Sequence, residues 1–174
     1  MGTIKLGIKL VGTHAIISIV EFFLLIPLTG IWENNQIFQW IIGLLQIFIL
    51  WFIVYADVSN TGQNELKRDT FRKPKGFFIG LVASIPALIL LLLTISIRNE
   101  PNYAQVALRF WLTPYSKVFI SFEKYMPYLA IVPIVLLPII TGLSYLDGIR
   151  KRNKILDTIN QAKDKRAEKS KVDK

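Results

Sequence analysis

The sequence contains no cysteine and only one histidine, His14. Without cysteine the chain cannot form disulfides, thiolate metal sites or a cysteine nucleophile. A single histidine also argues against a metal centre built from several histidines. The chain has no Walker phosphate-binding motif, HExxH zinc helix, GxSxG nucleophile elbow or GxGxxG nucleotide-binding turn. We therefore expect no metal, no cofactor, no catalytic residues and no enzymatic activity.

Charged residues are also scarce. They make up 19% of the 174 residues, whereas an average soluble domain carries about 25%. Hydrophobic residues make up 52%, and the charges that exist are gathered in a few blocks between long apolar runs. This segregation is typical of integral membrane proteins. No connecting segment is long enough to fold as a separate soluble domain.

Four apolar segments have the length that a transmembrane helix needs. The first segment follows two lysines and has some features of a signal peptide. It is interrupted by His14 and Glu21 and lacks a good cleavage site, so we interpret it as a retained span. The sequence therefore predicts an all-α integral membrane protein with four transmembrane helices. The predicted spans are about 10–30, 37–56, 76–97 and 128–146.

The spans and their connections form one predicted transmembrane domain, residues 1–149, followed by a basic tail over residues 150–174. The first two spans are joined by a very short polar connection. They should therefore form a tight antiparallel hairpin that turns near Glu33 and Asn34. Beyond about residue 163 the tail contains only charged and small residues, and we expect it to be partly disordered.

Basic residues are distributed very unevenly about the four predicted spans. Seventeen of the 21 Lys and Arg residues lie before the first span, between the second and third, or after the fourth. The other four lie between the third and fourth spans. Because cytoplasmic loops are enriched in Lys and Arg, we predict a multi-pass protein of the cell membrane with both termini in the cytoplasm.

The net charge of +9 raises the question of nucleic acid, but no nucleic-acid-binding pattern accompanies it. Anionic lipid headgroups of the bilayer are the expected partner instead. The acidic residues of the central connection, including Glu65, are interpreted as solvated charge that balances the basic ones. The predicted lipid contacts are Lys67, Arg68, Arg72, Lys73, Lys75, Arg150, Lys151 and Arg152.

The segment 103–125, between the third and fourth spans, carries aromatic residues at helical spacing, with Trp111, Tyr115 and Phe119 among them. We expect an extracytoplasmic amphipathic helix that lies flat, with its aromatics in the headgroup zone. The alternative is that the aromatics pack on the ends of the protein's own spans. A re-entrant hairpin is disfavoured, because no apolar stretch in this segment is long enough.

His14, Ser18 and Glu21 interrupt the first span at a spacing that places all three on one face of a helix. Ionisable groups within the bilayer are costly, and each is a functional-site hypothesis by default. Gln46 lies level with Glu21 across the predicted hairpin, and we predict that a protonated Glu21 hydrogen-bonds to it. The set is either a path for protons or cations, or a polar clamp between two helices. We favour the clamp, because one hydrogen-bonded pair is enough to explain Glu21.

Small residues recur every fourth position in the third span, at Gly76, Gly80 and Ser84. This spacing lets two helix backbones approach closely. The partner helix could be the fourth span, the first span or a helix of another subunit. Prolines in the third and fourth spans should bend those helices.

Together these features predict a non-enzymatic accessory, scaffold or assembly subunit of a membrane complex. Ile155, Leu156 and Ile159 would offer an apolar stripe to a partner if the start of the tail is helical. The alternative function is a small transporter or channel component with a proton- or cation-linked path through the first span. Since four spans enclose little space, that function would require a homo-oligomer.

Overall fold

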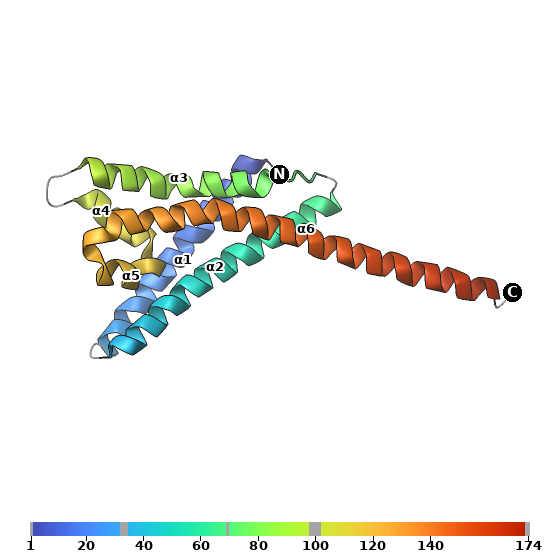
Figure 1. Cartoon of the computed structure of the whole chain (residues 1–174), viewed down its shortest axis with the longest axis horizontal. Coiled ribbons are helices and arrows are strands. Elements are labelled where there is room, and N and C mark those ends of the chain that lie inside the picture. The colour runs from blue at the N-terminus through green and yellow to red at the C-terminus, as the bar shows by residue number, and fades with distance from the viewer. Residues whose placement is uncertain (1, 32–34, 69, 98–101, 173–174) are drawn as a thin grey trace.

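The computed structural model describes the backbone of residues 2–31, 35–68, 70–97 and 102–172. Side chains are described over residues 2–24, 35–68, 70–97 and 102–163. The predicted turn at Glu33 and Asn34 lies outside these ranges. Within them the chain is built from helices, without strands (Figure 1).

The prediction of an all-α chain with four long apolar helices is confirmed. The stretches long and apolar enough to cross a membrane are Thr3–Leu24, Gln36–Lys67, Lys75–Ser96 and Glu123–Lys163. They belong to α1 (Thr3–Ile31), α2 (Gln36–Lys67), α3 (Lys75–Ser96) and α6 (Met126–Val172). A helix suits a membrane because it satisfies its backbone hydrogen bonds within the segment.

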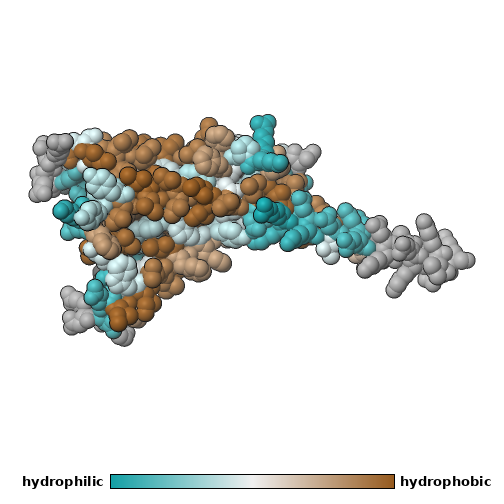
Figure 2. All heavy atoms as spheres, in the orientation of Figure 1, coloured by the Kyte–Doolittle hydropathy of each residue, from teal (hydrophilic) through white to brown (hydrophobic). Residues whose placement is uncertain are grey.

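The outer surface of the bundle is apolar, as Figure 2 shows for one face. Large hydrophobic side chains point outward from each long helix, among them Ile16 of α1, Phe48 of α2 and Leu92 of α3, which are all more than half exposed. A continuous apolar surface of this kind would be unfavourable in water and is suited to contact with lipid.

Two helices are longer than the sequence predicts. The helix α2 continues to Lys67 through residues that we expected in a loop, because its buried face repeats at Val58, Gly62 and Glu65. The helix α6 runs without a break to Val172, whereas the sequence predicts disorder beyond about residue 163. Alanine, lysine, arginine and glutamate are strong helix formers, and neither glycine nor proline interrupts this segment. The extension projects from the bundle (Figure 1).

Between α3 and α6 the chain forms a bent hairpin of short helices. Its first half is α4 (Tyr103–Trp111), and η1 (Thr113–Tyr115) makes the bend. Its second half is α5 (Ser116–Ser121) followed by η2 (Glu123–Tyr125). Asn102 caps α4 by accepting a hydrogen bond from the backbone N–H of Gln105.

The hairpin of α4, η1 and α5 is packed inside the bundle. Leu108, Leu112, Tyr115 and Phe119 are all buried, and the hairpin contacts α1, α2 and α3. The prediction of a flat interfacial helix with its aromatics among headgroups is therefore wrong. The segment can be buried although neither half is long enough to span the bilayer. Irregular backbone is tolerated within a membrane where the surrounding helices shield it from lipid.

The helices α3 and α6 lie side by side and form the most extensive contact between described elements (Figure 1). Gly76 and Gly80 face α6 so closely that a Cβ atom on either would overlap Tyr145, Thr141 or Pro138. The Ser84 hydroxyl is 3.1 Å from the carbonyl oxygen of Ile134 on α6. Of the partners left open by the sequence, the structure places the fourth span against the small-residue stripe.

Candidate functional site

The polar face of α1 points into the protein. His14, Ser18 and Glu21 are 7%, 1% and 4% exposed, so none of them faces lipid. Their spacing of four and three residues keeps them on one side of the helix. This side packs against α3 and against the hairpin rather than closely along α2.

His14 and Ser18 hold the tip of the hairpin through one backbone oxygen. The Ser18 hydroxyl donates a hydrogen bond of 2.8 Å to the carbonyl of Trp111, and Nε2 of His14 lies 3.0 Å from the same oxygen. The His14 ring also stacks on the Trp111 indole, with 5.1 Å between ring centroids. Because a carbonyl only accepts, His14 carries its proton on Nε2 in this arrangement.

The Trp111 carbonyl is open to these donors because of the local sequence. A continuing helix would satisfy this carbonyl with the N–H of residue 114 or 115. Pro114 has no N–H, and the N–H of Tyr115 donates to Leu112 instead. The Thr-Pro-Tyr bend therefore leaves an acceptor at the hairpin tip, and α1 satisfies it.

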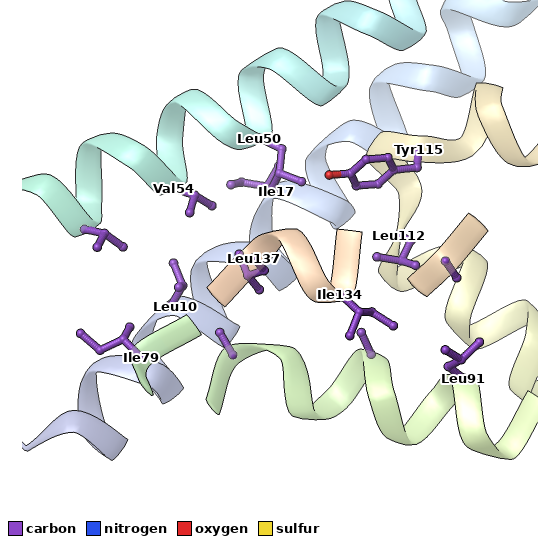
Figure 3. Packing of buried hydrophobic residues seen from close by; sticks show 14 of the residues in the cluster. Leu10, Ile17, Leu50, Val54, Ile79, Leu91, Leu112, Tyr115, Ile134 and Leu137 are labelled. Atoms are coloured by element: carbon purple, nitrogen blue, oxygen red, sulfur yellow. The ribbon is translucent and has the colours of Figure 1, made fainter. Parts of the chain in front are cut away.

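A cavity of about 20 Å³ lies beside this contact, which is enough for a water molecule. His14, Ser84 and Tyr115 supply polar atoms to its wall, and the rest of the wall is mainly apolar, including Leu50 and Leu112. Figure 3 shows the Tyr115 hydroxyl directed toward Leu50 and Ile17.

The cavity lies near the middle of the long helices. Its wall takes residues 83–87 from α3 and 133–137 from α6, and both stretches are far from the ends of the apolar segments. The hairpin tip therefore reaches the central level of the bundle and enters and leaves from the same end. The hairpin thus packs on the protein's own spans, as the alternative interpretation of its aromatics has it, and it has the form of the re-entrant hairpin that the sequence disfavoured.

The predicted hydrogen bond between Glu21 and Gln46 is absent. Both side chains are buried, but neither carboxyl oxygen of Glu21 has a hydrogen-bond partner. The prediction placed the two residues at one depth in a close hairpin, whereas α1 packs mainly on α3 and the hairpin of α4, η1 and α5, and less on α2 (Figure 1). Farther from their connection, Lys9 of α1 forms an ion pair with Asp57 of α2 at 2.5 Å, which the sequence does not predict.

Tyr115 is the functional candidate that the sequence reasoning placed wrongly. Its hydroxyl is buried and donates no hydrogen bond, although the Trp51 side chain lies close enough to interact with the phenol oxygen. A phenol has an ordinary pKa of about 10, so the hydroxyl is protonated at neutral pH and available as a donor. Its signal in the sequence was the Thr-Pro pair just before it, which predicts a helix break.

A second polar cluster lies where α2, α3 and α6 meet. Lys75 pairs with Glu65 at 2.5 Å, and the hydroxyl of Tyr145 donates to the other oxygen of Glu65 at 2.6 Å. Phe71 stacks on the Tyr145 ring. The interpretations of Lys75 as a lipid contact and of Glu65 as solvated charge are therefore wrong. They followed from treating residues 59–75 as a loop, where burial was not expected.

The other basic residues predicted to contact lipid headgroups lie at the surface. Lys67, Arg68, Arg72, Lys73 and Arg150 are exposed, and Arg152 is half-buried. Lys151 is exposed too, but it pairs with Asp147 at 2.9 Å and donates a hydrogen bond to the Tyr55 hydroxyl.

The chain matches no known protein family. No curated protein and no solved structure matches it either. Within the described residues, the structure has no group of three or more metal-ligating side chains. The polar groups of the site are the Trp111 carbonyl, the His14 imidazole and the Tyr115 phenol at a water-sized cavity, with the Glu21 carboxyl on the same face of α1 as His14.

Proposed function

We propose that this chain is a non-enzymatic, multi-pass protein of the cell membrane that serves as an accessory, scaffold or assembly subunit of a membrane complex. The extension of α6 is the observation that carries the proposal. Ile155, Leu156 and Ile159 are 45%, 38% and 43% exposed on this projecting helix. Exposed apolar side chains at this spacing form a stripe that another helix can cover.

The position of this stripe favours a protein partner over lipid. Asp147 and Lys151 interact with Tyr55 of α2 and mark the polar end of the bundle. With a rise of about 1.5 Å per residue, Ile155 lies about 12 Å beyond Asp147 along the helix, and Ile159 about 18 Å. A stripe so far along a helix that leaves the bundle lies beyond the hydrocarbon core.

The charged residues beside the apolar stripe indicate the charge expected of the partner. Arg152, Lys154 and Lys163 flank the apolar stripe, with Asp157 as an opposing charge. An amphipathic helix with acidic residues beside an apolar face would match both features. The exposed Lys67, Arg68, Arg72 and Lys73 near the same end suit contact with anionic headgroups.

The uneven distribution of Lys and Arg supports an orientation with both termini in the cytoplasm. Four spans bring the two termini to one side, and seventeen of the 21 basic residues then lie on that side. The hairpin of α4 and α5 accordingly enters the bundle from the extracytoplasmic side, and the α6 extension meets its partner in the cytoplasm.

Copurification tests the assembly role. Extraction in mild detergent followed by mass spectrometry should recover a stoichiometric membrane protein of different sequence. The triple variant Ile155→Ser, Leu156→Ser, Ile159→Ser should lose it. Its matched control changes exposed uncharged polar residues of the same segment, Asn153, Asn160 and Gln161, to serine and should retain it. Recovery of this chain alone, or an equal yield of partner with both variants, would contradict the proposal.

A proton-linked role is the second candidate, and the unpaired groups at mid-bundle favour it. Nδ1 of His14 and both carboxyl oxygens of Glu21 are buried without hydrogen-bond partners, and the buried Tyr115 hydroxyl donates no hydrogen bond. Such groups are costly in a membrane protein unless they have a use. The cavity beside them admits water but no organic solute. If deletion of the gene gives a cellular phenotype, expression of the Glu21→Gln variant should fail to restore wild-type behaviour. Full complementation by this variant would contradict the proton-linked role.

A further inference from the structure

Three buried titratable groups converge where the hairpin tip meets α1. Glu21 and His14 come from one face of α1, and Tyr115 comes from the bend of the hairpin. Tyr115 and His14 both line the cavity, and Glu21 lies two helical turns from His14 on the same face of α1, buried and without a hydrogen-bond partner. Three unsatisfied groups in one place are unusual, since most buried polar atoms in proteins are hydrogen-bonded.

The cavity offers a water the partners that it needs. A buried water makes about three hydrogen bonds. Nδ1 of His14 can accept one, the Tyr115 hydroxyl can donate or accept one, and the Ser84 hydroxyl supplies a third group on the wall. A water at this position would satisfy two of the unpaired atoms together.

The anchoring of His14 leaves its second nitrogen free to take up a proton. Nε2–H is committed to the Trp111 carbonyl, so the lone pair of the neutral ring is on Nδ1. Protonation at Nδ1 leaves the Nε2–H bond to the hairpin in place. The resulting cation would lie against the Trp111 indole face, which attracts positive charge.

We propose that His14 and Tyr115, connected by water in this cavity, form a proton-binding site in the middle of the membrane, anchored on the hairpin tip and with the buried Glu21 as its neighbour on α1. The proton is taken up by Nδ1 of His14, and the Tyr115 hydroxyl shares the bound water with it. Among the described residues, α2, α3 and α6 contribute no titratable side chain to the cavity wall. The cavity admits water and no larger molecule, so the ligand of this site is a proton together with a bound water.

This inference is independent of partner docking through α6 and supplies the site that a proton-linked role requires. A preparation that recovers a partner but lacks proton binding would overturn the site and leave the assembly role standing. A preparation that binds the proton but recovers no partner protein would overturn the assembly role and leave the proton-binding site standing.

The single histidine makes a direct test possible. Full-length protein with ¹⁵N-labelled histidine, reconstituted in lipid nanodiscs, gives ring signals that can come only from His14. Over a titration from about pH 8 to about pH 4, Nδ1 should gain a proton while Nε2 remains protonated. Glu21→Gln should move the midpoint of this titration by about one pH unit, the size expected for a coupled neighbour.

Matched variants separate this site from general effects of charge. Glu123→Gln removes a carboxylate whose side chain is 70% exposed, at the outer end of the hairpin, and should leave the midpoint unchanged. Tyr115→Phe should shift the Nδ1 signal of the neutral ring. The Nε2 signal shows in each variant whether the contact with Trp111 has survived. The proposal is overturned if Nδ1 stays unprotonated throughout, or if Glu21→Gln and Glu123→Gln give the same midpoint.

Discussion

The Lys75 ammonium lies 2.5 Å from Oε1 of Glu65, and both side chains are more than nine-tenths buried. Tyr145, which is fully buried, donates to the second oxygen of the same carboxylate. This arrangement joins the end of α2 to the start of α3 and to α6. The polar groups of the cluster satisfy one another, so the charges are tolerated away from water.

Removal of one charge from this pair should destabilise the protein strongly. Lys75→Met leaves the Glu65 carboxylate buried without its cation, and such losses cost about 3–5 kcal/mol. The double variant Lys75→Met, Glu65→Gln should recover part of that loss, because no isolated charge remains. The matched control is Lys9→Met in the more exposed pair with Asp57, which should cost at most about 1 kcal/mol. Thermal unfolding in detergent measures all three, and equal losses at Lys75 and Lys9 would contradict a buried role.

The close approach of α3 and α6 predicts that Gly80→Ala is harmful. The new Cβ would lie 2.5 Å from Cα of Pro138, and backbone atoms cannot move aside cheaply. Overpacking of this kind costs about 1–3 kcal/mol. Gly12→Ala is the control within a helix, since nothing lies within 4 Å of its new Cβ. It should be neutral or stabilising by up to about 1 kcal/mol. Thermal unfolding in the same detergent measures the stability of both variants. A Gly80→Ala protein as stable as the wild type would argue against the close contact between α3 and α6.

The buried hairpin predicts a pattern of chemical accessibility that the cysteine-free chain can report. A cysteine at Tyr115 should be protected from a water-soluble maleimide, whereas one at the exposed Lys124 should react. Adding His14→Ala and Ser18→Ala removes both donors to Trp111 and should raise the reactivity at position 115. The rate of labelling in intact vesicles is the measurement. Rapid labelling at position 115 without those changes would place the segment at the membrane surface instead.

The distribution of basic residues predicts the outcome of fusion reporters. Alkaline phosphatase folds only outside the cytoplasm, so a fusion at the C-terminus should be inactive. A fusion placed between α3 and α4 should be active, because four basic residues make this the less basic side. Phosphatase activity of whole cells, normalised to the amount of fusion protein, tests both. An active C-terminal fusion would reverse the proposed orientation.

Much of the architecture follows from composition alone. Apolar runs of about 20 residues have few alternatives to a transmembrane helix, because lipid offers no hydrogen-bond partner to the backbone. The spacing of His14, Ser18 and Glu21 placed them on one face of α1, which the structure shows turned inward. Periodicity within a segment is local information, so the sequence carries it.

The sequence could not indicate which polar residues of the connections are buried, because that depends on which helices pack against one another. Glu65 and Lys75 looked solvated because a loop was expected there, and only the meeting of α2, α3 and α6 buries them. Burial in a membrane protein depends on how the helices cross, and hydropathy does not encode that.

The sequence by itself determined that this chain is helical, that four of its segments can cross a membrane, and which face of α1 is polar. Tertiary structure alone decided that the hairpin enters the bundle, that Trp111 accepts from His14 and Ser18, and that Glu21 lies without a hydrogen-bond partner. The physical reason is that hydrophobicity and helical period act along the chain, whereas the partner of a buried polar group is set by packing between distant segments.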